Sequence, residues 1–225
     1  MVRARSRVET GPMAGCCDPR GCDHMFGSAF AQHVARRFRR RGLDPTARRM
    51  VDFLAADGVG GATVLDIGGG VGEIGIELLR RGAATATTLE LSPAYDDEAR
   101  RLAREAGVAD RAHRQVTDIA AAPDEVEPAD LVVLHRVVCC YPDYDRLLGA
   151  AAEHCRGRLV FSHPPRTLIS RGFVAAQGAV FRLLGREYRA FAHPPAAMVA
   201  AAAARGLRPV TAGSGLVWQI AGLAR

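Results

Sequence analysis

The 225-residue sequence contains no lysine, so all 30 of its basic residues are arginines. This absence excludes any chemistry that needs a lysine amine. Long hydrophobic runs are also missing, and no stretch approaches the roughly 20 apolar residues of a membrane-spanning helix. The basic first residues lead into no apolar segment, so they do not predict a secretory signal. We therefore expect a cytoplasmic protein without a transmembrane segment.

Acidic residues are scarce at the start of the chain. Residues 1–49 hold 11 arginines against four acidic residues, whereas the remainder is nearly neutral. A basic arm of this kind can contact RNA or anionic lipid. No aromatic stacking motif accompanies the arginines, so we favour a solvated helix face and expect no nucleic-acid partner. Translation from Met1 and translation from Met13 are equal alternatives here.

The most informative segment is VLDIGGGVGE, residues 64–73. An apolar strand ends in Asp66, passes through a glycine turn and opens directly into a helix. Glycines permit so tight a turn and let a ligand lie against the backbone. The spacing is G-x-G-x-G. The third glycine of a dinucleotide-binding G-x-G-x-x-G would fall at Glu73, whose carboxylate would repel a pyrophosphate. The loop therefore favours a nucleoside without phosphates.

This loop resembles the glycine motif of class I S-adenosylmethionine (SAM) dependent methyltransferases. Glu90 ends the next apolar run, 20 residues after Gly70, where a carboxylate can accept hydrogen bonds from ribose hydroxyls. Asp118 ends a third short run, where the family has an acid that faces the adenine amino group. The resemblance thus implies SAM as cofactor. It implies a cofactor site formed by Asp66, Gly68, Gly70, Gly72, Glu90, Leu91, Asp118, Ile119 and His135.

Strand patterns and helical patterns alternate after the glycine loop. The strand patterns cover residues 64–67, 84–89, 113–116, 130–134 and 158–161, and the helical ones cover 73–81, 95–106, 143–153, 173–184 and 195–204. Such alternation predicts a parallel sheet covered by helices on both faces. Two closing strands, 207–211 and 216–223, would include the antiparallel edge strand of the resembled family.

Two helices are predicted before the first strand. Apolar residues at steps of four between residues 26 and 38 predict a helix that Gly42 ends. Asp44 and Pro45, an N-cap followed by proline at the first helical position, begin another. In the resembled family such extensions fold over the cofactor and acceptor pocket. The expected fold is α/β, a Rossmann-like doubly wound, mostly parallel sheet with an antiparallel edge strand and an N-terminal helical cap. We divide the chain into residues 1–43 (tail, cysteine-bearing loop and cap helix) and residues 44–225 (methyltransferase domain).

Methyl transfer from a sulfonium is an in-line displacement, so the enzyme mainly positions two reactants and excludes water. A base is needed only if the acceptor must lose a proton. The segment HRVVCCYPD, residues 135–143, follows the fourth strand, where ligands bind in open α/β sheets. The resemblance implies that it lines the methionine part of SAM and then faces the acceptor. A structural role for the histidine and loop packing for the tyrosine are the alternatives. The candidate catalytic residues are His135, Cys139, Cys140 and Tyr141.

Cysteines form a second candidate cluster. The six cysteines do not predict disulfides in an intracellular chain, and adjacent cysteines are poorly shaped to bridge each other. If the N-terminal extension caps the pocket, Cys16, Cys17 and Cys22 would approach Cys139 and Cys140. Several thiolates together suit zinc or a thiol-bound metalloid acceptor. Against this, the C-C-x4-C spacing lacks the C-x2-C of zinc motifs, and free cysteine is also a common small buried residue.

Two segments of the C-terminal third, FSHPPRT (161–167) and YRAFAHP (188–194), are similar in layout to magnesium-protoporphyrin O-methyltransferases. Those enzymes methylate a propionate carboxylate on a tetrapyrrole. The resemblance implies that Arg166 or Arg189 holds an acceptor carboxylate through a bidentate pair. It also implies that His163 or His193 orients the acceptor. Surface or loop-packing roles are the alternative for these four residues.

The sequence therefore predicts a SAM-dependent methyltransferase that acts on a small molecule. The acceptor is open between an oxygen of a carboxylate or hydroxyl on a planar molecule, a thiol or thiol-bound metalloid, and RNA, which only the arginine-rich arm suggests. A metal-binding or SAM-sensing protein that keeps the fold without turnover is the alternative from a different class.

Overall fold

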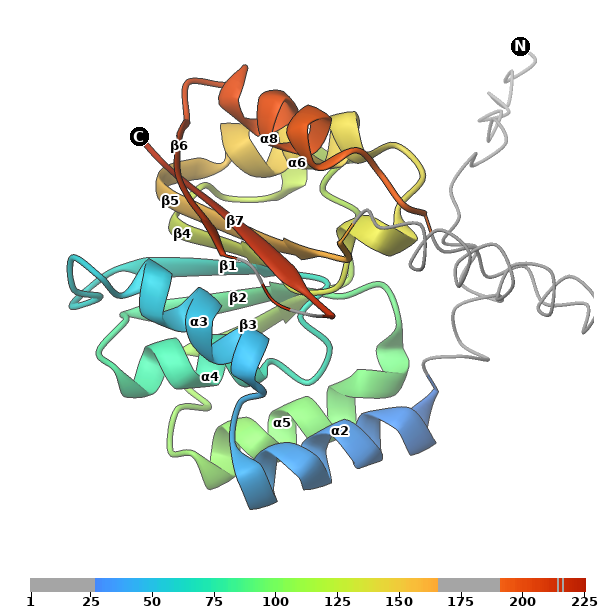
Figure 1. Cartoon of the computed structure of the whole chain (residues 1–225). Helices are drawn as coiled ribbons and strands as arrows, with labels where there is room; N and C mark the ends of the chain where they lie inside the picture. The colour runs from blue at the N-terminus through green and yellow to red at the C-terminus, as the bar shows by residue number, and fades with distance from the viewer. Residues whose placement is uncertain (1–26, 166–190, 214, 216) are drawn as a thin grey trace, which may run out of the picture.

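The computed structural model describes residues 27–165, 191–213, 215 and 217–225 (Figure 1). The strands are β1 (Thr63–Ile67), β2 (Thr85–Leu89), β3 (Ala112–Gln115), β4 (Ala129–Leu134), β5 (Cys155–His163), β6 (Arg208–Gly213) and β7 (Gln219–Ala224). The α-helices are α2 (Ser28–Arg41), α3 (Pro45–Leu54), α4 (Glu73–Arg80), α5 (Asp96–Glu105), α6 (Tyr144–Glu153) and α8 (Pro195–Ala203). Short 3₁₀ turns are η1 (Pro93–Tyr95), η2 (Pro123–Glu125) and η3 (Val138–Cys140).

All seven strands form one sheet in the order β3-β2-β1-β4-β5-β7-β6. Strands β1 to β5 pair in parallel, whereas β7 is antiparallel to both of its neighbours, β5 and β6. The chain leaves β1 toward β2 on one side and returns to β4 on the other. The carboxyl ends of β1 and β4 therefore flank a crevice, which is the usual ligand position in open α/β sheets.

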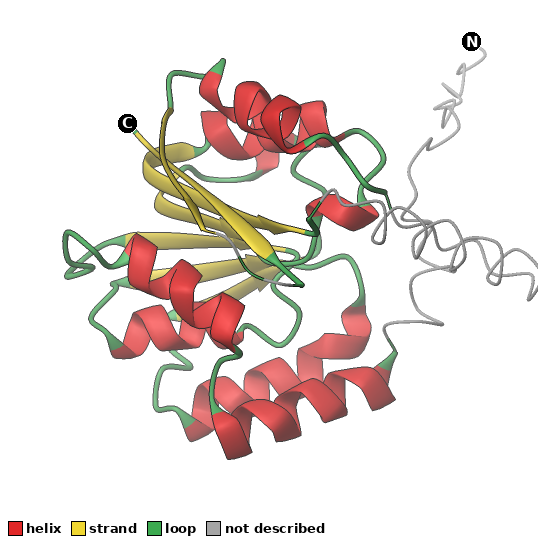
Figure 2. Ribbon diagram, in the orientation of Figure 1, coloured by secondary structure: helices red, strands yellow, loops and turns green. Residues whose placement is uncertain are grey.

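Helices cover both faces of the sheet (Figures 1 and 2). Helices α3, α4 and α5 lie on one face, with α2 packed outside α5, and helices α6 and α8 lie on the other. Each face has its own apolar core. Met50, Leu54 and Leu78 are buried on the first face, and Leu148, Leu159 and Phe161 on the second. The predicted doubly wound α/β fold with an N-terminal helical cap is confirmed.

Local sequence signals explain where the two N-terminal helices begin and end. Gly42 follows α2 with a left-handed φ of 67°, a conformation that glycine adopts without steric cost. Asp44 precedes α3, and its Oδ1 accepts hydrogen bonds from the backbone N–H groups of Thr46 and Ala47. Pro45 occupies the first helical position, where no N–H is needed. The boundary that we drew between residues 43 and 44 falls between these two helices.

Helix α2 is held against α5 by ion pairs as well as by apolar contacts. The Arg39 guanidinium donates to Glu105 at 2.7 Å and to Glu98 at 3.0 Å. Ala31, Ala35 and Phe38 bury the apolar side of the same helix. The arginines on its other faces are therefore partly solvated and partly used for packing within the chain.

The predicted elements agree with the structure within a few residues, and the differences have local causes. Helix α2 ends at Arg41, directly before Gly42 as predicted, whereas β5 begins at Cys155 instead of residue 158. The predicted helix 173–184 lies outside the described residues. Among the described helices, none combines the length and the apolar character that a bilayer crossing requires.

The earlier start of β5 depends on a β-bulge. Ala129 pairs with Cys155 and Leu131 pairs with Arg158, so two residues of β5 lie opposite the single residue Asp130. Gly157 is one of the two, and a Cβ on it would lie 2.8 Å from the Asp130 carbonyl oxygen. The strand can continue through this point because residue 157 has no side chain.

The Gly157→Ala variant should lose about 1–3 kcal/mol of its free energy of unfolding, since the added methyl must displace backbone and not a flexible side chain. Urea unfolding followed by circular dichroism measures the change. Gly60→Ala is the matched control, because a Cβ there would meet nothing within 4 Å. Equal stabilities of the two variants would show that the bulge tolerates a side chain.

Candidate functional site

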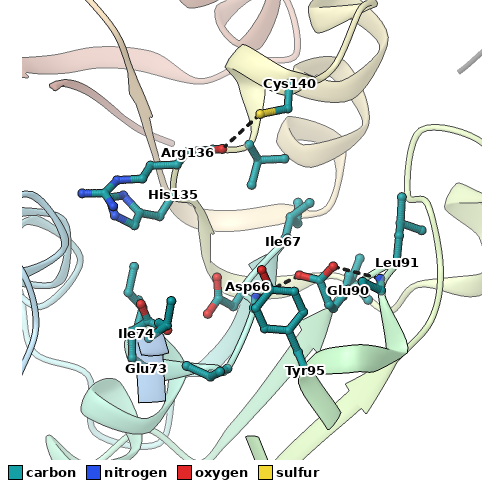
Figure 3. Close-up of a pocket in the computed structure, with 18 of the residues that line it drawn as sticks. Asp66, Ile67, Glu73, Ile74, Glu90, Leu91, Tyr95, His135, Arg136 and Cys140 are labelled. Atoms are coloured by element: carbon teal, nitrogen blue, oxygen red, sulfur yellow. Dashed lines mark hydrogen bonds between the residues drawn. The ribbon is translucent and has the colours of Figure 1, made fainter. Parts of the chain in front are cut away.

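A cavity of about 390 Å³ opens where β1, β2 and β4 end, within the 300–1,000 Å³ range of small-molecule sites. The glycine loop forms its floor, and the segment after β4 and helix α2 form its walls. Figure 3 shows Asp66, Glu73 and Glu90 on one side of the cavity, with His135, Arg136 and Cys140 on the other. The cavity is lined by most of the residues that the sequence nominated for the cofactor, namely Asp66, Gly68, Gly70, Glu90, Leu91, Asp118, Ile119 and His135.

The glycine loop is the part of the site that tolerates side chains least. Gly68 and Gly70 have φ angles of 65° and 55°, which L-residues rarely adopt. A Cβ on Gly68 would lie 2.5 Å from a methyl group of Val137, and one on Gly69 would lie 2.5 Å from the Asp66 carboxylate. The loop backbone therefore lies close to Val137 in the wall after β4 and to the buried Asp66 side chain of β1. Gly72, which we also assigned to the cofactor, instead lies at the N-terminus of α4 and lines a separate cavity between α4 and α5.

Glu90 connects the glycine loop to the end of β2. One carboxylate oxygen accepts a hydrogen bond from the Gly70 N–H and the other from the Ser92 N–H, both at 3.0 Å (Figure 3). Each oxygen has a second lone pair that can accept a ligand hydroxyl. The spacing of 20 residues between Gly70 and Glu90 thus corresponds to a direct contact in the folded chain.

Asp66 is a buried carboxylate below the glycine loop. It is 1% exposed, and neither of its oxygens accepts a hydrogen bond within the described part of the chain. Burial and, second to it, the nearby Glu73 carboxylate raise the pKa of Asp66 to about 7. Burial also raises the pKa of Glu73. Two carboxyl groups without strong partners make this side of the cavity suited to a cationic group.

Tyr141 closes the adjacent part of the cavity. Its hydroxyl donates a hydrogen bond to Asp118 at 3.0 Å, and the other Asp118 oxygen accepts from the Ala120 N–H. The pair joins the segment after β4 to the loop after β3. Tyr141 therefore holds the cavity wall together, and its hydroxyl is engaged within the protein.

His135 contacts polar side chains through both ring nitrogens. Nδ1 lies 3.1 Å from the Ser162 hydroxyl and Nε2 lies 3.3 Å from an Asp44 oxygen. Because a carboxylate only accepts, Nε2 carries the proton that faces Asp44. Arg136 follows with a φ of 62°, the one non-glycine residue of the described chain with positive φ. Its backbone N–H donates to Ser162 at 2.8 Å.

Cys139 and Cys140 lie in the turn η3, with their sulfur atoms 3.6 Å apart. Both thiols point to the Arg136 carbonyl oxygen, at 3.6 and 3.8 Å. Cys140 lines the cavity and Cys139 does not. The neighbouring Cys140 thiol and burial raise the pKa of Cys139 well above its usual range. A protonated Cys139 is a poor nucleophile, because the thiolate is the reactive form.

The residues that the sequence nominated for acceptor binding do not gather at this cavity within the described chain. His163 is buried, its Nδ1 faces the Pro164 carbonyl, and burial lowers its pKa. His193 stacks on Phe191, and its Nε2 lies 2.9 Å from the Tyr141 carbonyl oxygen. His193 therefore supports the cavity wall at Tyr141, whereas His163 contacts its own chain neighbour at the end of β5. Arg166 and Arg189 lie outside the described residues.

No cluster of three or more His, Cys, Asp or Glu side chains within the described residues could hold a metal ion. The predicted zinc site is therefore without support in this part of the structure. Cys16, Cys17 and Cys22, which were to form it, lie outside the described residues. Cys155 is buried at the start of β5, away from the cavity.

Helix α2 contributes cavity residues that the sequence did not identify. Phe30, His33, Val34 and Arg37 line the cavity from one face of this helix. The exposed fraction of Phe30 is 43%, which is high for a large apolar side chain on the same helix as the buried Phe38. The apolar period of four was visible in the sequence. The resemblance also predicted that this extension folds over the cofactor pocket, but it did not identify which side chains of the helix line it.

Comparisons with known proteins agree with this architecture. A family model described as "Methyltransferase domain" matches residues 35–208. A comparison with curated protein sequences finds no match.

Solved structures share the fold at low sequence identity. A magnesium protoporphyrin IX methyltransferase from Synechocystis with bound S-adenosylhomocysteine (SAH) has a TM-score of 0.68 and 22% identity, over 90% of this chain and 99% of that one. An O-methyltransferase family protein from Burkholderia thailandensis has a TM-score of 0.67 and 21% identity, over 93% of this chain and 60% of that one. An O-methyltransferase family 2 protein from Planctomyces limnophilus in complex with apigenin has a TM-score of 0.65 and 20% identity, over 88% and 61%.

Replacing Glu90 with alanine should weaken SAH binding by about tenfold or more, because the ribose loses a charged acceptor and the glycine loop loses a tether. Isothermal titration calorimetry measures the dissociation constant. Glu125→Ala, an exposed glutamate in η2, is the control and should bind SAH as the wild type does. Unchanged binding in Glu90→Ala would remove this residue from the cofactor site.

Asp66 should make SAM binding pH-dependent. Its carboxyl is mostly protonated at pH 5.5 and mostly charged at pH 7.5, so SAM should bind more tightly as the pH rises through about 7. Without ligand, Asp66 makes the free energy of unfolding fall as the pH rises, which is the opposite direction. A carboxyl whose pKa is raised by folding stabilises the fold fully below its unfolded pKa, and this contribution is lost as the pH rises through the folded value.

The Asp66→Asn variant tests both signs. Its affinity for SAM should be weak and should not change with pH over this range. Without ligand, its melting temperature at pH 7.5 should be higher than that of the wild type. Asp124→Asn, on the exposed turn η2, serves as the control. A wild-type affinity that falls with rising pH would contradict the assignment.

Proposed function

The chain belongs to the methyltransferase domain family and is a SAM-dependent methyltransferase, and from this premise we propose that it methylates an oxygen of a small-molecule acceptor, with a carboxylate as the favoured group. SAM supplies an electrophilic methyl group when it is bound. The residues of this chain have to bind the donor, align the acceptor and exclude water.

The described side chains fit SAM as a cofactor. The orphaned carboxylate of Asp66, together with Glu73, suits the ammonium group at the methionine end. Because the glycine loop carries no side chains, a nucleoside can lie directly against its backbone. Glu90 has free lone pairs for the ribose hydroxyls. We assign to Asp118, which lines the cavity, the hydrogen bond from the adenine amino group.

One observation carries the preference for a carboxylate. All four side chains that the sequence nominated for catalysis are engaged within the protein: His135 with Ser162 and Asp44, Tyr141 with Asp118, and the two cysteines with each other and with Arg136. Asp66 and Glu73 lie on the methionine side of the cavity. An acceptor that is already anionic at neutral pH needs no base before it attacks the methyl group. A carboxylate meets this condition, whereas a neutral hydroxyl does not.

The surroundings of the cavity support a planar or apolar acceptor. Phe30 and Val34 of α2 provide apolar surface, and Arg37 on the same face provides a positive charge. Two structural neighbours are described as a magnesium protoporphyrin IX methyltransferase and as an O-methyltransferase family 2 protein in complex with apigenin, and these descriptions support the proposal. Arg166 and Arg189 stay as sequence-based proposals for a bidentate contact with an acceptor carboxylate.

A thiol-bound metalloid is the second candidate acceptor. The 3.6 Å separation of the Cys139 and Cys140 sulfurs is close to the roughly 3.8 Å between two ligands of a tetrahedral centre with bonds of about 2.3 Å. The raised pKa of Cys139 disfavours it, because soft ions bind thiolates. The oxygen acceptor therefore has the stronger support.

The test is to incubate the protein with methyl-labelled SAM and the small-molecule fraction of a host extract, and then to treat the labelled product with base. A carboxylate product is a methyl ester, which base hydrolyses to labelled methanol, whereas ethers and thioethers keep their label. We expect a base-labile product. A base-stable product would contradict the carboxylate. Absence of any product in a protein that binds SAH would favour a SAM-sensing protein without turnover.

The Cys139→Ser/Cys140→Ser double variant separates the two acceptor classes. With an oxygen acceptor it should keep near-wild-type turnover, because neither thiol takes part in the reaction. Cys155→Ser, which changes a buried thiol remote from the cavity, controls for loss of stability. Turnover that disappears in the double variant but not in the control would instead favour the thiol-bound metalloid.

A further inference from the structure

Asp44 connects the N-terminal helices to the wall of the cavity. Its two carboxylate oxygens have different hydrogen-bond partners. Oδ1 accepts the backbone N–H groups of Thr46 and Ala47 at the start of α3. Oδ2 faces His135 Nε2 at 3.3 Å and the Arg136 guanidinium at 3.0 Å. Asp44 itself does not line the cavity, so it acts through the residues that do.

Two arginines and one histidine that line the cavity lie near the Asp44 carboxylate. The Arg37 guanidinium, from α2, lies 3.7 Å from Oδ2, so three cavity residues from two distant parts of the chain meet it. The Asp44 side chain is only 9% exposed. Despite its burial, its pKa lies well below the usual range, because His135, the Ala47 N–H and Arg136 favour the charged form. Asp44 is therefore a permanent negative charge behind the wall.

The contacts Ser162–His135–Asp44 have the order of a hydrolase triad, but they cannot perform that chemistry. Ser162 is 0% exposed, so no substrate reaches its hydroxyl. Its oxygen accepts the Arg136 N–H, and its proton faces His135 Nδ1. The three side chains instead fix the ring of His135 and the left-handed backbone of Arg136 at the end of β4. This arrangement is structural support for the cavity wall.

We propose that Asp44 is a positioning residue for the methyl donor: it holds His135 and Arg136 against the cavity wall and offsets the positive charge of Arg136 and Arg37, so that the wall accepts a cationic sulfonium. Without this carboxylate, the two arginines would repel the sulfonium of SAM. SAH carries a neutral sulfur and would be affected much less. The inference depends on SAM as methyl donor and not on the identity of the acceptor.

The experiment compares the dissociation constants of SAM and SAH by calorimetry in the Asp44→Asn variant. Asparagine is as good an N-cap as aspartate, so α3 keeps its first hydrogen bonds while the charge is lost. The affinity for SAM should fall on the order of fivefold relative to the affinity for SAH. An unchanged ratio would overturn the proposal, and if both ligands weakened equally, Asp44 would have only a structural role.

Two further variants keep the test decisive. Asp143→Asn is the matched control, since Asp143 caps α6 in the same way but lies outside the cavity, and it should leave the ratio unchanged. Arg136→Gln removes one of the cations and should shift the ratio in the opposite direction, toward SAM. The double variant Asp44→Asn/Arg136→Gln should return the ratio to that of the wild type. A double variant that stays as low as Asp44→Asn would contradict the charge argument. Absence of SAH binding in the wild type would instead count against the cofactor assignment itself.

Discussion

The close approach of a side-chain-free backbone to Val137 in the cavity wall and to Asp66 of β1 is the constraint on which the rest of the site depends. Gly68 lies against Val137 and Gly69 against Asp66, with no room for a Cβ at either position. The turn brings the end of β1 within reach of both the segment after β4 and the acid after β2. A bulkier loop would separate these strand ends and leave Asp66 open to water. The burial of Asp66, and the raised pKa that follows, are thus consequences of the glycine geometry.

Features encoded by nearby residues could be predicted from the sequence. Short apolar runs and helical apolar spacing located nearly every described strand and helix, because the central parallel strands are buried on both faces and the helices on one. The glycine loop and Glu90 could be paired in advance, since their contact joins the ends of two neighbouring parallel strands. The family and the fold class followed from these same local signals.

Contacts between distant segments could not be predicted. The sequence identified Asp44 as a helix cap. It did not indicate that the second carboxylate oxygen contacts His135 and Arg136, which follow 91 and 92 positions later in the chain. Tyr141 and Asp118 were both nominated, yet nothing local indicated that they would hydrogen-bond to each other. Similarly, Gly72 belongs to the glycine motif but faces another cavity, because the helix turns away from the loop at that residue. Pairings of this kind arise only from the packing of the whole sheet.

Helix α2 forms one wall of the cavity, and ion pairs of Arg39 with Glu98 and Glu105 hold this helix against α5. These ion pairs are near the surface, where dissolved salt screens their attraction. This wall of the cavity is therefore held partly by charge pairs that lie outside the cavity, so rising ionic strength should weaken the packing of α2 on α5 while the cavity side chains stay the same.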